Sequence, residues 1–194
     1  LRDSDNVFLI KQNQVIDYSF KRTKTEDVVT KVVYKYQESY AKKRYMKSVE
    51  ARVDANYGDI FDYYKIKIDH SESTLIIDDH RSKYIRDDRS ARDFCKFILG
   101  WYMNQHLIIN IKVPLSVGLD KEIGDLLSFD SLLGGVKPYG IDYTDFVAIG
   151  STNLRDSLNN QVIFGEFLIT KTNKNLEFVE IECIQLHKGM PSDV

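Results

Sequence analysis

The sequence predicts a mainly β protein of the α+β class, with antiparallel β-barrel or sandwich subdomains and one amphipathic helix packed on the sheet. Short runs of β-branched and aromatic residues, bounded by polar segments, recur along the chain and favour strands. Strong helical periodicity occurs at about residues 88–103. One helix among hairpins does not make the repeating βαβ pattern of a doubly wound nucleotide-binding fold, which the sequence therefore disfavours.

Short strands are expected up to residue 77. Runs of apolar residues predict them at residues 7–11, 15–20, 28–36, 59–68 and 74–77. Residues 41–51 leave two options open: a short helix that carries Tyr45, Met46 and Val49 on one face, or an exposed loop.

The helix at about 88–103 is the clearest single element. Asp87 or Asp88 can cap it, because a short carboxylate accepts hydrogen bonds from the free N–H groups of the first turn. Spacing of three and four residues then places one apolar set on a single face: Ala91, Phe94, Cys95, Ile98, Trp101 and Tyr102. We expect this face to dock on the sheet, with Phe94, Ile98, Trp101 and Tyr102 in the core.

Strands are again expected after the helix. Apolar residues alternate with other residues from Leu107 to Val113, which is the two-residue period of a strand, and Pro114 ends the ladder. Gly124 marks a turn into a strand that ends at Phe129. Residues 161–172 and 176–186 form the clearest predicted hairpin. The core residues expected here are Ile109, Ile111, Phe129 and Ile181.

The chain is expected to divide into a β-rich N-terminal subdomain, residues 1–80, and a helix plus barrel-like subdomain, residues 81–194. Glycine and proline break up residues 131–160, which are predicted to be irregular. Within them, aromatic area and hydrogen-bonding groups make Tyr139, Asp142 and Tyr143 a candidate interface. An aromatic-packed loop is the alternative.

Composition indicates an ordinary folded protein. The 194 residues are 43% hydrophobic and 29% charged. No apolar run approaches the roughly 20 residues that span a bilayer, and the polar N-terminus lacks the apolar core of a secretory signal. The first residue is not Met, which suggests processing, a trimmed chain or, as we favour, a fragment of a longer protein.

The net charge of −2 hides an asymmetry. Residues 1–52 have a formal balance of +5 and residues 53–194 one of −7. Such polarity can orient assembly with another protein or help a basic face approach phosphate groups. For Lys42, Lys43 and Arg44, a solvated face or a protein contact is favoured over nucleic-acid binding.

No catalytic residue, cofactor site or metal site is predicted. Cys95 and Cys183 lie in apolar patterns and are expected to be small core residues. The four His residues are too scattered to define a metal site by spacing. Asp120, Glu122 and Asp125 are interpreted as solvated turn residues, since no acid–base geometry can be read from sequence.

The order of several short motifs resembles central tail-hub or baseplate-hub proteins of tailed bacteriophages. The resemblance covers residues 74–187 and rests on segments 84–87, 90–91, 104–107, 113–115, 123–125, 139–144 and 179–187. It implies small β-barrel domains arranged around a central channel, usually as trimers. It also implies a mechanical role in the virion, connecting the tail tube to tip components, with no membrane segment.

The implied partners are copies of the chain in a homotrimer and other phage tail proteins, with passage of DNA and tape-measure protein through the channel. The protein would be made in the host cytoplasm. A carbohydrate-binding adsorption module is the alternative, which the placement of Trp101 on the buried helix face weakens. A tail-associated hydrolase is the third reading, and it would require converging carboxylates or a metal pocket.

Overall fold

The computed structural model describes residues 7–52, 73–130, 136, 138–140, 154–155, 162–163 and 165–186, so the strand expected at 59–68 lies outside them. These residues form two compact units. Unit 1 contains residues 7–23 and the described residues from 106 onward, and unit 2 contains residues 24–52 and 73–105. This division differs from the predicted boundary at residue 80, because the helix that follows residue 80 packs against strands that precede it.

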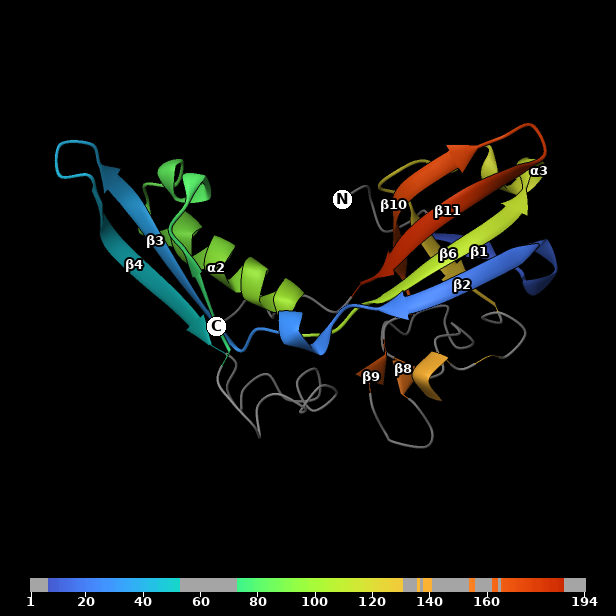
Figure 1. Cartoon of the computed structure of the whole chain (residues 1–194), viewed down its shortest axis with the longest axis horizontal. Helices are drawn as coiled ribbons and strands as arrows, with labels where there is room; N and C mark the ends of the chain where they lie inside the picture. Colours follow the sequence, from blue (N-terminus) through green and yellow to red (C-terminus); the bar gives the residue numbers. More distant parts are fainter. Residues whose placement is uncertain are drawn as a thin grey trace. The chain divides into compact units, whose positions relative to one another are not determined.

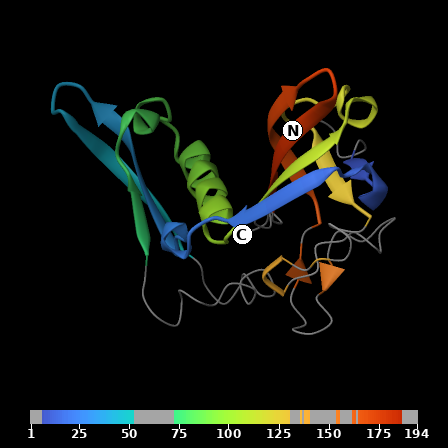
Figure 2. The ribbon, with the colours of Figure 1, turned by 45° about the vertical axis from the view of Figure 1, so that its right-hand side comes forward.

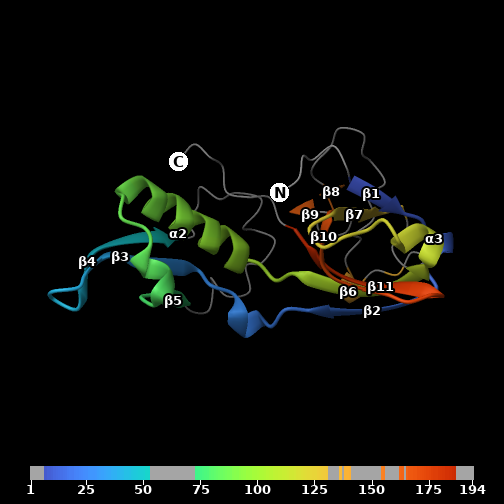
Figure 3. The same cartoon turned by 90° about the horizontal axis from the view of Figure 1, so that it is seen from above.

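Unit 1 is built on a six-stranded sheet in the order β1-β7-β10-β11-β6-β2 (Figure 1). β1 and β7 run parallel, and the other neighbouring pairs run antiparallel. Figure 3 shows that the sheet curls into a half-barrel, with β1 and β7 in one layer and β6, β11 and β2 in the other. The strands are β1 (Val7–Ile10), β2 (Asp17–Arg22), β6 (Leu107–Pro114), β7 (Leu126–Phe129), β10 (Phe167–Lys174) and β11 (Phe178–Gln185).

Shorter elements accompany this sheet in the described part of unit 1. They are η1 (Gln12–Gln14), α3 (Leu115–Gly118), η7 (Pro138–Gly140) and a two-stranded pair of β8 (Leu154–Arg155) and β9 (Val162–Ile163). The predicted C-terminal hairpin is confirmed, because β10 and β11 pair from Phe167 with Gln185 to Lys174 with Val179.

The inner face of the half-barrel holds the core of unit 1. Alternate residues of β6 are buried as the two-residue period predicts, and they lie beside alternate residues of β11. Phe129 and Phe167 meet edge to face, with their ring centroids 5.3 Å apart. The predicted core residues Ile109, Ile111, Phe129 and Ile181 are all buried.

Gly118 allows α3 to lie directly on the sheet. A Cβ atom added there would stand 2.6 Å from Val179 Cβ and 2.9 Å from Val113 Cγ2. Both neighbours are β-branched residues of paired strands, so they have little freedom to move aside.

Replacing Gly118 by Ala is therefore expected to lower the free energy of unfolding by about 1 to 3 kcal/mol through overpacking. Urea unfolding measures the change, and Ser116→Ala, an exposed position of the same short helix, is the matched control. Adding Val179→Ala to Gly118→Ala should cost less than the sum of the two single changes. Strict additivity would contradict the close contact.

Unit 2 is a three-stranded sheet with one long helix along it (Figure 2). The strand order is β4-β3-β5, with β3 and β4 antiparallel and β3 and β5 parallel. The elements are η2 (Thr25–Asp27), β3 (Lys31–Ser39), β4 (Arg44–Arg52), β5 (Thr74–Ile77), η5 (His80–Lys83) and α2 (Asp88–Tyr102). The predicted class, mainly β with one main helix, is confirmed.

Two details differ from the sequence prediction. Most of the segment 41–51, expected as helix or loop, belongs to β4 (Arg44–Arg52), because pairing with β3 supplies its backbone hydrogen bonds. The pairs β1–β7 and β3–β5 are parallel, whereas only antiparallel pairing was expected. Parallel partner strands are separated by long connections, so local sequence patterns do not indicate which strands pair.

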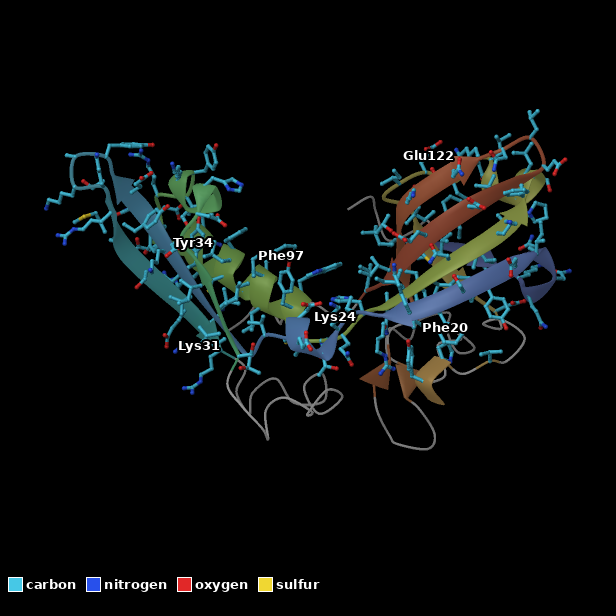
Figure 4. The ribbon with its side chains drawn as sticks, viewed as in Figure 1. Phe20, Lys24, Lys31, Tyr34, Phe97 and Glu122 are labelled. Carbon is cyan, nitrogen blue, oxygen red and sulfur yellow. The ribbon has the colours of Figure 1, made fainter. Side chains whose placement is uncertain are left out.

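The core of unit 2 lies between α2 and β3. Buried side chains of the helix, including Cys95 and Leu99, meet Val32, Tyr34 and Tyr36 of the strand. The Tyr34 ring meets the Phe94 ring edge to face, with centroids 4.9 Å apart. It is also stacked with the Tyr36 ring, with centroids 6.1 Å apart. Figure 4 labels Tyr34 on the helix side of β3 and Phe97 on the side of α2 that points away from the sheet.

The buried stripe of α2 is rotated from the predicted one. It consists of Ala91, Cys95 and Leu99. Phe94 and Ile98 pack at its edge and are partly buried, as is Trp101. Tyr102 is a correction: it is 38% exposed, because the buried stripe continues from Leu99 to Met103 and Tyr102 lies beside it.

The start of α2 is tied to the sheet by carboxylates. Asp87 caps the helix by accepting hydrogen bonds from Arg89 N and Ser90 N at 3.1 and 2.8 Å. Asp88 accepts from Lys47 Nζ at 2.7 Å and Tyr36 Oη at 3.0 Å. These hydrogen bonds, that of Lys47 foremost, hold the pKa of Asp88 below its ordinary value of 3.8.

Asp88→Asn is expected to lower stability at neutral pH, because Asn cannot pair with the Lys47 ammonium. A lowered pKa in the folded state means that the carboxylate contributes stability above its unfolded pKa and loses it as the pH falls through the folded pKa. The difference in melting temperature between Asp88→Asn and the wild type should therefore shrink from about pH 7 to about pH 3. Asp93→Asn, which removes only a long 3.9 Å ion pair with Arg89, is the control. A difference that does not vary with pH would contradict this role.

Candidate interaction surfaces

The outer face of the six-stranded sheet carries a shallow polar depression of about 310 Å³. Register places its side chains in two rows across four strands. One row consists of Asp17, Lys112, Glu180 and Asn173, and the other consists of Ser19, Asn110, Glu182 and Lys171.

Several charged groups in this depression are engaged by their own neighbours. Lys112 Nζ lies 3.7 Å from Glu180 Oε1, and Asn173 Nδ2 donates to Glu180 Oε2 at 3.2 Å. Thr170 Oγ1 donates to Glu182 Oε1 at 3.2 Å. Such cross-strand pairs suit a hydrated sheet face or a polar contact, and they bring no nucleophile and base together.

Tyr139, a predicted interface residue, packs on β2. It has a positive φ of 55°. Its ring meets Phe20 edge to face at 5.9 Å, and the Arg22 guanidinium lies 4.4 Å from its centroid. The residue is nevertheless 55% exposed, so Tyr139 packs on β2 while part of its surface stays available. Asp142 and Tyr143 lie outside the described residues, and their interface role stays a prediction.

Exposed aliphatic side chains gather where α3 meets the turn between β10 and β11. Leu176 in that turn is 94% exposed, and Leu119 and Ile123 are also exposed. Lys174 Nζ joins the two segments, donating to Leu119 O at 2.8 Å and to Glu122 Oε1 at 2.6 Å. We call this surface, Leu119, Ile123 and Leu176 with the flanking acids Asp120, Glu122 and Glu177, the aliphatic end. Figure 1 shows α3 beside this turn, and Figure 4 labels Glu122 near β10.

A second exposed surface lies at the turn between β3 and β4. Tyr40 is 66% exposed, and Lys42, Lys43, Arg44 and Met46 are exposed beside it. Lys43 takes a positive φ of 49°, which turns the chain back into β4. We call these five residues the basic tip. Figure 1 shows the turn at the far end of the hairpin, beyond α2.

The acids and cysteines considered in the sequence analysis each have separate surroundings. Asp120 pairs with Lys121, Glu122 pairs with Lys174, and Asp125 Oδ2 accepts from Glu122 N at 2.9 Å. Cys95 and Cys183 are free and buried; burial raises the pKa of Cys95 to about 11 and that of Cys183 further. Within the described ranges there is no group of three His, Cys, Asp or Glu that could hold a metal ion.

None of the helices in the described part of the chain is both long and apolar enough to cross a bilayer.

Neither a protein-family model nor a curated protein sequence matches the chain. Among solved structures, a chain from the virion of a native gene transfer agent particle aligns with 100% of this chain, with a TM-score of 0.55 and 14% identity. Prophage tail protein gp18 from Listeria monocytogenes EGD-e aligns with 94% of it, with a TM-score of 0.43 and 13% identity. The chain spans 35% and 44% of those two chains. At this identity, the similarity to the virion chain shows a shared fold.

Proposed function

We propose that the chain is a structural protein of a phage-type virion, a segment of the tail hub or baseplate that connects the tail tube to tip components. The observation that carries the proposal is the alignment of the whole chain with part of one chain of a gene transfer agent virion. The order of motifs over residues 74–187 supports the same reading independently of the fold.

The proposed role is mechanical and involves no bond chemistry. A half-barrel with a continuous inner core can hold a fixed geometry, since strand pairing and interior packing resist deformation. The carboxylates closest in sequence are each tied to a neighbouring lysine or backbone group, which leaves them poorly placed to act together on a substrate.

Assembly supplies the finer part of the proposal. Copies of the chain associate as a homotrimer around a central channel that passes DNA and tape-measure protein, and other tail proteins bind the outside. Tyr139, Asp142 and Tyr143 contribute to these contacts. Synthesis takes place in the host cytoplasm, and the finished protein resides in the virion.

Electron cryo-microscopy of intact particles tests the proposal directly. The chain should fit density at the junction of tail tube and tip, in three copies around the axis. Density at a peripheral fibre, together with binding of host polysaccharide by the isolated monomer, would instead support an adsorption module. Absence of the chain from purified particles would overturn the virion assignment, and cell-wall degradation by the pure chain would overturn the non-enzymatic one.

A further inference from the structure

The basic tip concentrates positive charge that no ion pair within the described part of the chain neutralises. Residues 40–47 contain four Lys or Arg and no Asp or Glu. Among the described residues, none forms an ion pair with Lys42, Lys43 or Arg44, whereas nearby Lys47 is held by Asp88. Tyr40 and Met46 add exposed apolar surface between the charges. The tip therefore suits a partner surface that is both acidic and apolar.

The aliphatic end has the complementary composition. Asp120, Glu122 and Glu177 are exposed around Leu119, Ile123 and Leu176. Each local lysine pairs with one of these acids but is less exposed than its partner: Lys121 is buried, with Nζ 2.8 Å from Asp120 Oδ1 and 3.7 Å from the centroid of Phe8, and Lys174 is held by Leu119 O and Glu122. The charges that face solvent are thus mainly carboxylates, around aliphatic side chains that nothing in the described part of unit 1 covers.

We propose that the basic tip of one copy docks on the aliphatic end of a second copy of this chain. The tip belongs to unit 2 and the aliphatic end to unit 1, so the contact joins two different surfaces and is heterologous. Heterologous contacts generate rings when the rotation between copies closes. The inference deepens the proposed function and rests on it, since it names surfaces through which a ring of copies would form.

Each surface lies at the end of strands that lead away from the residues joining the units. Within the described residues, the chain passes between the units at residues 23–24 and 105–106. The tip follows the nine residues of β3, and the aliphatic end follows the eight residues of β6 and then α3. At about 3.3 Å per strand residue, both lie roughly 25 to 30 Å along their unit from the connection. Each unit thus presents its surface at an end remote from the covalent joint.

Charge reversal tests the contact in the full 194-residue chain. The first variant combines three substitutions: Lys42→Glu, Lys43→Glu and Arg44→Glu. In sedimentation equilibrium its self-association should be about 100-fold weaker than that of the wild type, because like charges would then meet. Glu122→Lys with Glu177→Lys should have the same effect. Far-UV circular dichroism checks that both variants keep the fold, which is expected since all five positions are exposed.

Mixing the two variants separates this pairing from a general charge effect. The acidified tip of one variant matches the basic end of the other, and the unaltered surfaces match as well, so an equimolar mixture should recover contacts between unlike copies at 1:1 composition. A three-membered ring would always contain one pair of like variants, so the recovered complexes should be open or even-membered. Lys11→Glu, Lys21→Glu, Lys24→Glu changes the net charge equally at exposed positions elsewhere and should leave association unchanged. Leu176→Ser should weaken it without any change of charge.

A wild-type chain that stays monomeric at all concentrations would overturn the contact, as would a tip reversal without effect or a mixture that does not recover. If the tip instead made a contact within its own chain, or bound nucleic acid, the wild-type chain would stay monomeric. The proposed function is tested separately by the position of the chain in particles. It can therefore stand where this contact fails.

Discussion

Replacing Phe129 by Ala is expected to lower the free energy of unfolding by about 3 to 5 kcal/mol, which would be among the largest single-residue effects in the chain. Phe129 is 1% exposed at the end of β7 and meets the buried Phe167 of β10 edge to face. Truncation removes this aromatic contact and leaves a cavity between paired strands that cannot close.

Hydrogen exchange measured by mass spectrometry localises the effect, because peptides from β10 and β11 should lose protection in the Phe129→Ala variant. Leu9→Ala, on exposed surface of neighbouring β1, is the control and should change stability by less than about 0.5 kcal/mol. A loss below about 1 kcal/mol for Phe129→Ala would mean that the half-barrel core is not packed as described.

Leu99→Ala is expected to cost about 2 to 5 kcal/mol in unit 2. Leu99 is fully buried between α2 and the sheet, in the same cluster as Tyr34 and Cys95. Trp101 is the only Trp of the chain and lies two residues away, so its fluorescence in a urea titration reports the transition of this unit.

Phe97→Ala is the matched control for this change, since Phe97 sits on the same helix but is 67% exposed. It should leave the urea midpoint nearly unchanged despite removing a larger side chain. Equal losses for Leu99→Ala and Phe97→Ala would show that the stripe of Ala91, Cys95 and Leu99 does not face the core.

Periodicity was sufficient where burial is one-sided and local. Leu107 to Val113 alternate in sequence and in burial, because β6 has one face on the core and the other outward. Asp87 was identified as a possible cap because capping depends only on residues within the first turn. The helix face was less well defined, since hydrophobic residues span more than half of its circumference and only the neighbouring sheet selects Leu99 over Tyr102.

Pairing partners could not be derived in the same way. β4 contains exposed polar residues at most positions and becomes a strand through its pairing with β3. The parallel partners of β1 and β5 are chosen by tertiary packing, for which short apolar segments give no signal.

The candidate surfaces were partly visible in the sequence. Lys42, Lys43 and Arg44 are consecutive, so their charge could be noted at once. Leu119, Ile123 and Leu176 look like ordinary core residues by type, and only the fold reveals that they are exposed together. Tyr139 was identified from composition, but its contact with Phe20 and Arg22 required coordinates.

The pairing of Val7 with Leu126 has a consequence for how the protein emerges from the ribosome. The helix and strands of unit 2 all precede residue 106, so this unit can close its core early in translation, from contacts near in sequence. β1 and β2 are synthesised first, yet they acquire their neighbours only after β6 and β7 have been made. The earliest strands of the nascent chain therefore remain unpaired for the longest time. Their open edges are where premature association with other chains would begin.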